Sequence, residues 1–148
     1  MRGADLLTKA LSEAGVKTIF SLSGNQIMPV YDACIDAGIR LVHVRHEASA
    51  VFMADAWAQL TGNVGVALVT AAPGFGNGLG PLYTASASES PVVFLSGDAP
   101  VGQDGQGAFQ ELDQAAVSAP LTKASRSGDK KETNVSRPPY RYQQRKGT

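Results

Sequence analysis

The run Val64-Gly65-Val66-Ala67-Leu68-Val69-Thr70 constrains the fold of this chain more than any other feature of its sequence. It carries no charged residue, and it is far shorter than the ~20 apolar residues that span a membrane. An apolar run of this length predicts a strand that is covered on both faces, which is typical of parallel sheets flanked by helices. The run therefore predicts an α/β protein.

Helical and strand patterns alternate along the rest of the chain. Helices are predicted over residues 4–14, 26–37, 48–60 and about 77–87, and further strands over 18–22, 40–44 and 91–96. A loop follows at 99–107, and the stretch 109–117 fits a short helix. Regular alternation of this kind implies right-handed βαβ units. We therefore expect a three-layer, doubly wound parallel sheet.

Composition indicates a globular body followed by a tail. Residues 1–124 are acidic overall, which argues against nucleic acid as a partner, and residues 125–148 are basic and nearly devoid of apolar side chains. We therefore predict a folded domain over 1–124 and a disordered tail over 125–148. Cys34 is the only cysteine, so no internal disulfide is possible, and we expect it to be a buried thiol. No signal peptide or membrane span is evident, and a cytoplasmic location is expected.

The segment Arg45-His46-Glu47 places a carboxylate where the strand at 40–44 gives way to a helix. Ligands of open α/β sheets bind just beyond the carboxyl ends of the strands, so Glu47 is a candidate for chemistry. A purely structural explanation is also available. An acidic residue in the first turn of a helix complements the helix dipole and is common for that reason alone.

Other loops follow strands at the same predicted edge of the sheet. They are Gly24-Asn25-Gln26, the glycine-rich stretch from Ala72-Pro73-Gly74 to Gly78, and Gly97-Asp98-Ala99-Pro100. The glycine-rich stretch lacks the third glycine of a dinucleotide fingerprint, and no Gly-Lys-Ser/Thr of a phosphate loop occurs in the chain. It is therefore a weak phosphate site, although glycines allow a flat group to approach the backbone closely.

Several spaced motifs together resemble a known family. Gly3-Ala4-Asp5, Arg45-His46-Glu47, Ala72-Pro73-Gly74-Phe75 with Asn77-Gly78, Ser90-Pro91 and Ala108-Phe109-Gln110-Glu111 are similar to the pyrimidine-binding (PYR) domain of thiamine diphosphate enzymes. The resemblance is strongest to acetolactate synthase-like proteins and extends to oxalyl-CoA decarboxylase and 2-hydroxyacyl-CoA lyase. It covers roughly residues 3–125 and implies the thiamine diphosphate-binding fold.

The resemblance implies a role for the candidate residues. Glu47 would be catalytic, hydrogen-bonding N1′ of the cofactor's aminopyrimidine and helping the cofactor to lose its C2 proton. Pro73, Gly74 and Asn77 would border the pyrimidine ring. The remaining candidates are Gly24 and Asn25, lining the same cleft, and Phe109 and Gln110, reaching toward the substrate. Alternative interpretations are that Asn77 caps a helix, that Phe109 belongs to the core and that Gln110 is a surface residue.

The resemblance also implies what this chain lacks. Family members hold the diphosphate through Mg²⁺ in a second domain, with Gly-Asp-Gly and a later Asn as the binding motif. Gly97-Asp98-Ala99 lacks the second glycine, and the next asparagine is Asn134 in the tail, so no metal site is predicted here. The family domain normally continues past residue 125. We therefore expect an incomplete PYR domain, without its last elements, followed by a tail of truncated or frame-shifted origin.

Four hypotheses about function remain open at this point. The first is a thiamine diphosphate-binding half-domain of an enzyme that cleaves or forms a C–C bond beside a 2-oxo or 2-hydroxyacyl carbonyl, inactive on its own. The second is the stand-alone PYR subunit of a two-chain decarboxylase, as in sulfopyruvate decarboxylase, and the third is a non-catalytic module that pairs with intact homologues. Partners would be the diphosphate-binding domain of another chain or a homologue, and intact relatives would form homo-oligomers. A nucleotide-binding regulator using Gly74–Gly80 is the fourth.

Overall fold

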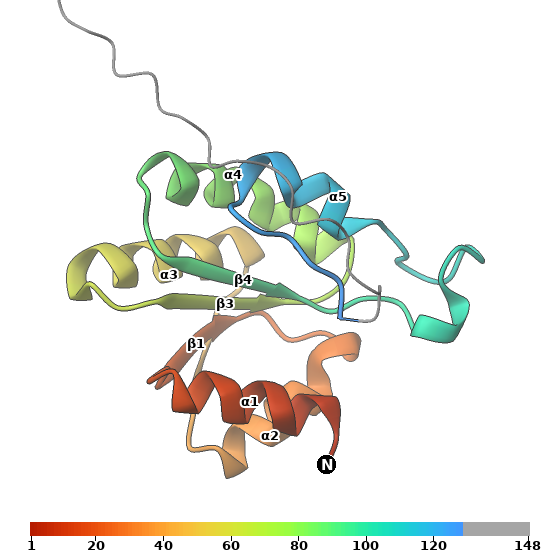
Figure 1. Ribbon diagram of the computed structural model, residues 1–148, viewed down its shortest axis with the longest axis horizontal. Helices are drawn as coiled ribbons and strands as arrows, with labels where there is room; N and C mark the ends of the chain where they lie inside the picture. Colours follow the sequence, from red (N-terminus) through yellow and green to blue (C-terminus); the bar gives the residue numbers. More distant parts are fainter. Residues whose placement is uncertain (129–148) are drawn as a thin grey trace, which may run out of the picture. The chain divides into compact units, whose positions relative to one another are not determined.

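The computed structural model of the protein describes residues 1–128. Four parallel strands form one sheet in the order β2-β1-β3-β4. The strands are β1 (Thr18–Ser21), β2 (Arg40–His43), β3 (Gly65–Val69) and β4 (Val92–Ser96). The helices that accompany them are α1 (Gly3–Glu13), α2 (Met28–Asp36), α3 (Glu47–Thr61) and α4 (Pro73–Ala87). This is the predicted doubly wound α/β fold (Figure 1).

The helices form a layer on each face of the sheet. Figure 1 shows α1 and α2 together on one side of the strands and α3 with α4 on the other. The strand order explains this division. The chain moves from β1 outward to β2, and after returning to β3 it moves outward to β4 in the opposite direction. Because crossovers of parallel strands are right-handed, a reversal of direction places the connecting helices on opposite faces.

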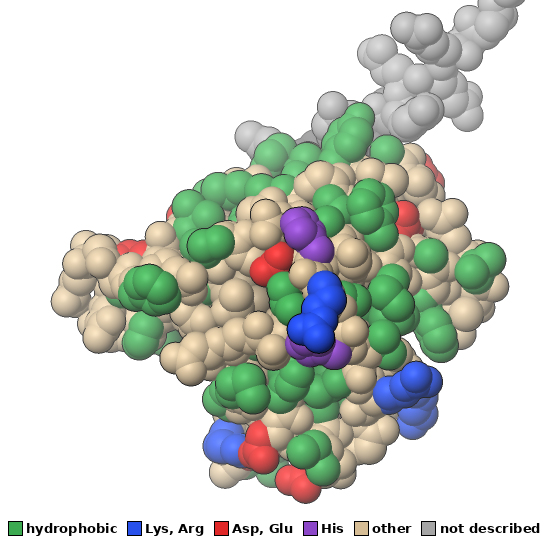
Figure 2. Space-filling view, turned by 180° about the vertical axis from the view of Figure 1, so that it is seen from behind, with side chains coloured by type: hydrophobic (Ala, Val, Ile, Leu, Met, Phe, Trp, Pro, Cys, Tyr) green, Lys and Arg blue, Asp and Glu red, His purple; other side chains and the backbone are tan. Residues whose placement is uncertain are grey.

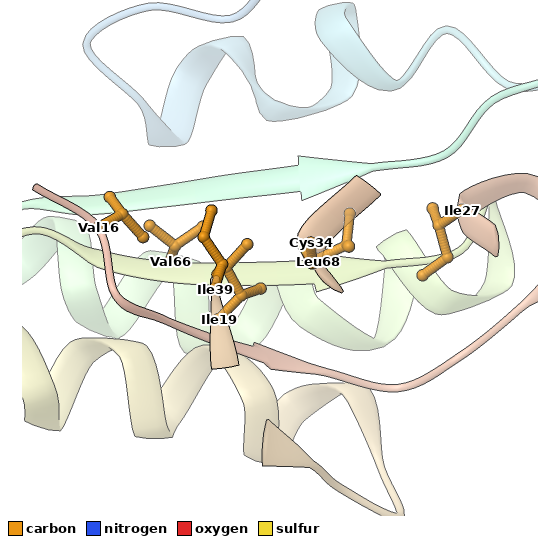
Figure 3. Close-up of a cluster of buried hydrophobic side chains, with 7 residues drawn as sticks. All are labelled: Val16, Ile19, Ile27, Cys34, Ile39, Val66 and Leu68. Atoms are coloured by element: carbon orange, nitrogen blue, oxygen red, sulfur yellow. The ribbon is translucent and has the colours of Figure 1, made fainter. Parts of the chain in front are cut away.

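The face under α1 and α2 carries the main aliphatic core. The cluster contains Val16, Ile19, Ile27, Cys34, Ile39, Val66 and Leu68, all of them buried (Figure 3). The prediction for Cys34 is confirmed, since its side chain is fully buried, and burial raises the pKa of its thiol. Pro29 lies in the first turn of α2, the only helical position where proline is well tolerated.

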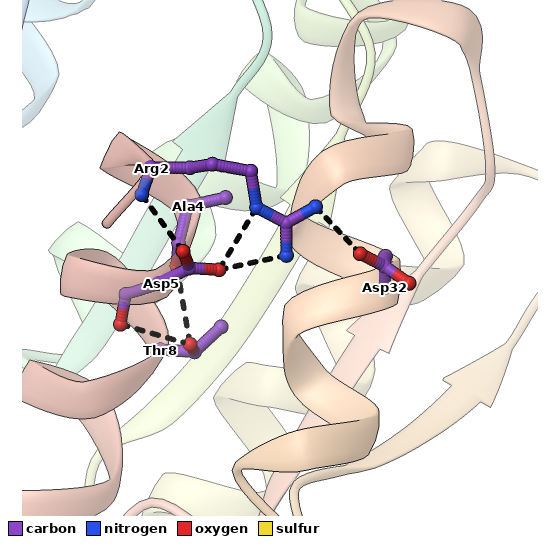
Figure 4. A network of polar contacts seen from close by, with 5 residues as sticks. All are labelled: Arg2, Ala4, Asp5, Thr8 and Asp32. Atoms are coloured by element: carbon purple, nitrogen blue, oxygen red, sulfur yellow. Dashed lines mark hydrogen bonds and ion pairs between the residues drawn. The ribbon is translucent and has the colours of Figure 1, made fainter.

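The start of the chain is held against α2 by an exposed ion-pair cluster. Arg2 donates through its backbone N–H to Asp5 Oδ2 over 2.7 Å and through its guanidinium to Asp5 Oδ1, and it reaches Asp32 over 2.6 Å (Figure 4). Thr8 donates its hydroxyl to the carbonyls of Ala4 and Asp5 within the helix. The hydrogen bond from Arg2 lowers the pKa of the Asp5 carboxyl. The cluster links α1 to α2.

The opposite face is packed with small residues. Ala50, Ala54 and Ala58 of α3 are all buried, and a Cβ built on Gly65 of β3 would lie only 1.9 Å from the carbonyl oxygen of Ala54. In the same way, a Cβ on Gly78 of α4 would lie 2.4 Å from Cζ of Phe94. The backbones of α3 and β3 therefore approach closely at Gly65, and the Phe94 ring occupies the space beside Gly78, because neither glycine carries a side chain.

Two predicted element boundaries are wrong. The stretch that opens at Ala72-Pro73-Gly74 was expected to be a loop, with a helix only from about residue 77, but α4 begins at Pro73, so Gly74 and Gly76 belong to its first turn. Proline suits the start of a helix, and Gly78 is compensated by its contact with Phe94. The predicted helix at 26–37 is instead a 3-10 turn, η1 (Asn25–Ile27), followed by α2.

The chain divides into two compact units with the boundary between Leu112 and Asp113. The first unit contains the sheet and a 3-10 turn, η2 (Val101–Gln103); the second contains α5 (Gln114–Ser118) and a 3-10 turn, η3 (Ala119–Leu121). The predicted helix over 109–117 is therefore too long. Its first half is interrupted by Gln110, whose φ of 62° is incompatible with a right-handed helix.

The predicted tail begins inside the second unit. Ser125 Oγ lies 2.6 Å from Ser118 Oγ, so the first residues of the tail contact α5. The prediction of disorder concerns mainly residues 129–148, which lie outside the described residues. The division of the chain into a domain over 1–124 and a tail stays a prediction.

Candidate cofactor site

The loops after β1 and β3 lie at the point where the direction of strand order reverses. In open α/β sheets this switch point, at the carboxyl ends of the strands, is where ligands bind. The two loops are in close contact, since a Cβ built on Gly24 would lie 2.4 Å from Cβ of Thr70. Gly24 is therefore required for the loops to approach each other, and any side chain there would push them apart.

Glu47 is delivered to this edge by the β2–α3 connection. His46 is the N-cap of α3 and its Nδ1 accepts a hydrogen bond of 3.1 Å from the backbone N–H of Ala48. This cap fixes the start of the helix, so that Glu47 is its first residue and its carboxylate is half-buried. His43, Arg45 and His46 are exposed nearby in sequence. Figure 2 shows the two histidines of the chain, in purple, on one face with a basic side chain between them.

The Glu47 carboxylate has one oxygen fixed by the neighbouring helix. Asn77 of α4 donates from Nδ2 to Glu47 Oε2 over 2.9 Å. No hydrogen bond to Oε1 is formed within residues 1–128. A Cβ built on Gly74 would lie 3.2 Å from that oxygen. The second oxygen of Glu47 therefore faces a position where the absence of a side chain leaves room.

The turn that leads into α4 is shaped around this position. Ala72 has φ 27° and ψ −77°, which is an unusual backbone conformation for a residue with a side chain. The Cβ of a side chain at Gly74 would also lie 3.0 Å from Cγ2 of Thr70. Thr70 thus borders both Gly74 and Gly24 and joins the loops after β1 and β3.

A chain of side-chain hydrogen bonds continues from Thr70. Its hydroxyl donates to Gln26 Oε1 over 2.6 Å, and Gln26 Nε2 donates to Gln110 Oε1 over 2.8 Å. The backbone carbonyl of Thr70 accepts a 2.9 Å hydrogen bond from the hydroxyl of Ser96 at the end of β4. The carboxyl ends of β1, β3 and β4 and the segment containing Gln110 are therefore linked by polar contacts.

The structure brings together most of the residues singled out from sequence. Asn77 is hydrogen-bonded to Glu47, and Gly74 lies beside the Glu47 carboxylate. Gly24 and Gly74 both adjoin Thr70, which is linked through Gln26 to Gln110. Asn25, Pro73 and Phe109 are exposed, and Phe109 retains 81% of its accessible surface.

The structure also tests the alternative interpretations given for Asn77, Phe109 and Gln110. Asn77 does not cap a helix, because the N-cap of α4 is Ala72. Phe109 is not part of the core. Gln110 is half-buried and hydrogen-bonded rather than a free surface residue.

Sequence reasoning missed Gln26 and Thr70 as members of this site. Gln26 was placed in a loop at this edge, next to a predicted helix, but was given no role in the site, and Thr70 was placed at the last position of a strand. Their signal was available: both follow strands at the same sheet edge as the other candidates. What was missing is the long-range pairing, because Gln26 and Gln110 are far apart in sequence.

No group of three or more His, Cys, Asp and Glu side chains in the described part of the chain is placed to hold a metal ion. Asp98 of the rejected Gly97-Asp98-Ala99 motif accepts a 2.8 Å hydrogen bond from the backbone N–H of Ala99. Among residues 1–128, no helix is both long and apolar enough to cross a membrane.

Comparison with known proteins assigns the chain to a family. Residues 1–117 match the family described as thiamine pyrophosphate enzyme, N-terminal TPP binding domain. The match covers well over half of the chain, and the chain belongs to this family of thiamine diphosphate (thiamine pyrophosphate) enzymes. The predicted family and fold are thereby confirmed.

Individual relatives carry two kinds of name. The acetolactate synthase large subunit IlvG of Mycobacterium tuberculosis is 39% identical over 123 residues, which are 83% of this chain and 22% of that protein. The 2-hydroxyacyl-CoA lyase 2 of Danio rerio is 45% identical over 121 residues, 82% of this chain and 20% of that protein. The catabolic acetolactate synthase of Raoultella terrigena is 40% identical over 121 residues, covering 82% and 22%. The chain thus spans about a fifth of the length of these relatives.

The residues present fit one end of thiamine diphosphate. A carboxylate oxygen that faces a residue without a Cβ suits a flat nitrogen heterocycle such as the aminopyrimidine.

Proposed function

We propose that this chain binds the aminopyrimidine end of thiamine diphosphate and that Glu47 is the catalytic carboxylate. The observation that carries the proposal is the arrangement of Glu47: Oε2 is held by Asn77, while Oε1 faces the bare backbone of Gly74. Thiamine diphosphate, when bound, supplies the carbanion chemistry needed to cleave or form a C–C bond beside a carbonyl. The names of the relatives suggest a 2-oxo or 2-hydroxyacyl carbonyl.

Several residues would each make a different contact with the aminopyrimidine ring. Glu47 Oε1 would face the pyrimidine N1′ and share one proton with it: a protonated carboxyl group would donate to N1′, and the carboxylate would accept from N1′ once that nitrogen is protonated, which is general acid–base chemistry by a positioned carboxyl group. The Asn77 amide keeps the carboxylate plane from rotating, because its hydrogen bond occupies Oε2. Gly74 keeps the approach open, and Pro73 borders it. Gly24 and Asn25 belong to the loop after β1 that closes the same edge.

The diphosphate and Mg²⁺ are held elsewhere in this proposal. A second domain, from another chain or from a full-length homologue, supplies those contacts and completes the active site. The chain alone is then a binding half-domain without turnover. Purified chain mixed with thiamine diphosphate, Mg²⁺ and pyruvate is expected to release no carbon dioxide, and steady release would contradict the proposal.

The decisive experiment is a binding titration of the full chain with thiamine diphosphate and with thiamine, which lacks the phosphates. If only the pyrimidine end is bound, the two ligands have similar dissociation constants. A markedly weaker affinity for thiamine would instead mean that this chain holds the phosphates.

Replacement of the carboxylate tests its role directly. Glu47→Gln keeps the size of the side chain but removes its charge, and we expect about tenfold weaker binding of thiamine, as for loss of a hydrogen bond to a charged group. Glu13→Gln is the matched control, because Glu13 is an exposed carboxylate at the end of α1. Equal affinities of the Glu47→Gln and Glu13→Gln variants would exclude Glu47 as a ligand contact.

Adding a separate diphosphate-binding chain distinguishes the remaining alternatives. Restored turnover would make this chain the PYR subunit of a two-chain decarboxylase. Stable association with an intact homologue and no gain in turnover would make it a non-catalytic pairing module.

A further inference from the structure

Gln26 uses both ends of its side-chain amide to join two parts of the site. Its Oε1 accepts from the Thr70 hydroxyl over 2.6 Å, and its Nε2 donates to Gln110 Oε1 over 2.8 Å. Gln26 is in the 3-10 turn after β1, Thr70 directly follows β3, and Gln110 lies beyond η2. A side chain that bridges three segments in this way restricts the orientation of each partner.

The bridge gives the hydrogen bonds one direction. The Gln26 carbonyl oxygen accepts from the Thr70 hydroxyl, so the Gln26 amino group is the end that faces Gln110. The Gln110 carbonyl oxygen therefore accepts the hydrogen bond from Gln26. The amino group of Gln110 then points away from the bridge, and no acceptor contacts it among the described residues. We call the hydrogen-bonded series Thr70–Gln26–Gln110 the relay. The Gln110 amino group is thus a donor at its end that has no acceptor among the described residues.

The backbone around Gln110 holds this arrangement in place. Gln110 has a φ of 62°, which is uncommon for a residue with a side chain. The Glu111 carboxylate accepts from the backbone N–H groups of Ala108, over 2.9 Å, and of Gly105. Phe109 is exposed while Gln110 is half-buried, so the turn directs the two neighbouring side chains differently.

The relay reaches the proposed cofactor site through Thr70. The Cγ2 atom of Thr70 lies 3.0 Å from the Cβ position of Gly74, and that position lies 3.2 Å from Glu47 Oε1. Thr70 and Glu47 therefore border the same position beside Gly74, and hydrogen bonds lead from Thr70 through Gln26 to Gln110.

We propose that Gln26 is a positioning residue that turns the amino group of Gln110 toward a hydrogen-bond acceptor on the substrate, a carboxylate or carbonyl oxygen. The inference rests on the proposed function, and it adds that Gln110, whose amino group has no acceptor within residues 1–128, borders the substrate. Gln26 itself acts through Gln110. If both side-chain amides were flipped, Gln110 would present its carbonyl oxygen to the substrate and would favour a hydrogen-bond donor there instead.

The Gln26→Glu variant separates these two directions. A carboxylate at position 26 can still accept from Thr70 but cannot donate, so Gln110 has to turn its amino group inward to meet it. In ¹⁵N-labelled full chain, we expect the side-chain NH₂ of Gln26 to be shifted downfield in the wild type and that of Gln110 only in Gln26→Glu. A downfield-shifted Gln110 NH₂ in the wild type, or no change in the variant, overturns the proposal.

Two further variants control this measurement. Gln26→Met has a similar length and no hydrogen bond, so it should leave the Gln110 amide with the shift of an exposed glutamine. Gln103→Glu makes the same chemical change at an exposed glutamine of η2 and should leave Gln110 unchanged. If Gln103→Glu moves the Gln110 amide as much as Gln26→Glu does, added charge explains the effect and the relay does not.

Pyruvate is the probe for the acceptor. With thiamine diphosphate and Mg²⁺ present, pyruvate should move the Gln110 side-chain resonance of the wild type, with about tenfold weaker affinity in Gln26→Glu. No response of Gln110 in the wild type overturns the assignment of the acceptor.

The outcomes keep the two proposals apart. If thiamine binding does not depend on Glu47 but the Gln110 NH₂ resonance still shifts downfield in Gln26→Glu, only the proposed function is contradicted. If thiamine binding depends on Glu47 but the Gln110 NH₂ resonance does not shift in Gln26→Glu, only the role of Gln26 is contradicted.

Discussion

The two faces of the sheet are packed in different ways. The face under α1 and α2 is filled by branched aliphatic side chains such as Ile19, Ile39 and Leu68. The face under α3 and α4 relies on alanine and glycine, so that the backbone of β3 at Gly65 directly meets the backbone of α3 at Ala54. An aliphatic core can adjust by changing rotamers, whereas contact between backbones cannot.

The difference matters because the site belongs to the second face. Glu47 is the first residue of α3, and Asn77 is in the second turn of α4. Their 2.9 Å hydrogen bond therefore depends on how closely both helices approach the sheet. We conclude that the aliphatic face mainly supplies stability, while the alanine and glycine face also sets the geometry of the site.

The largest expected effect comes from Gly65→Ala. The new Cβ would lie 1.9 Å from the Ala54 carbonyl oxygen, so α3 must move away from the sheet. We expect the free energy of unfolding, measured with urea, to fall by about 3 kcal/mol, and thiamine binding to weaken with it. Gly76→Ala is the control: its Cβ meets nothing within 4 Å, so the change should stabilise the chain by about 0.5 kcal/mol. Similar unfolding curves for the two variants would contradict the argument.

Gly78→Ala should have a smaller effect on stability and a distinct effect on the site. Its Cβ would lie 2.4 Å from Cζ of Phe94, a ring that stacks on Phe75 with centroids 5.7 Å apart. We expect a loss of about 2 kcal/mol in unfolding free energy and several-fold weaker thiamine binding, because Asn77 is carried on the same helix. Gly80→Ala, with open space around it, should change neither quantity unfavourably. Unaltered thiamine affinity in Gly78→Ala would separate the packing of α4 from the site.

Ile19→Val tests the aliphatic face. Ile19 is completely buried in the core cluster, so loss of one methylene should cost about 1 kcal/mol of unfolding free energy. Thiamine affinity should stay at the wild-type value, since this face does not position Glu47 or Asn77. A decrease in affinity comparable to that of Gly78→Ala would show that both faces set the site.

The smallest effect is expected for Asp5→Asn, at the surface of the aliphatic face. Because the hydrogen bond from Arg2 lowers the pKa of Asp5 in the folded chain, the pair adds stability above the ordinary carboxyl pKa of 3.8. That contribution is lost as the pH falls through the folded pKa. The difference in unfolding free energy between wild type and variant should thus shrink below about pH 4. A difference that is constant between pH 7 and pH 3 would contradict the ion-pair explanation.

Sequence patterns were sufficient for the architecture and for the central residue of the site. The apolar run at 64–70 predicts the buried strand β3, and the strand-to-helix change before Glu47 predicts its place at the carboxyl edge, because both depend on local periodicity. The family resemblance added Asn77, which the structure shows in contact with Glu47.

Other features depend on contacts that no local pattern reveals. The start of α4 was placed at about residue 77 rather than at Pro73, because glycines such as Gly74 and Gly76 disfavour a helix on their own. The relay from Thr70 through Gln26 to Gln110 joins residues far apart in the chain, so only the folded structure shows it.

The first turn of α4 has a consequence for the charge of the ligand that this edge accepts. The start of a helix usually attracts anions because its first N–H groups are unpaired. Here Pro73 has no N–H, and the N–H groups of Gly74 and Gly76 already donate to the carbonyls of Ala71 and Ala72 over 3.1 and 2.7 Å. Little of the usual anion-binding capacity remains, which argues against the nucleotide-binding hypothesis. The same hydrogen bonds support the proposal that this edge meets the uncharged aromatic part of the cofactor rather than its phosphate groups.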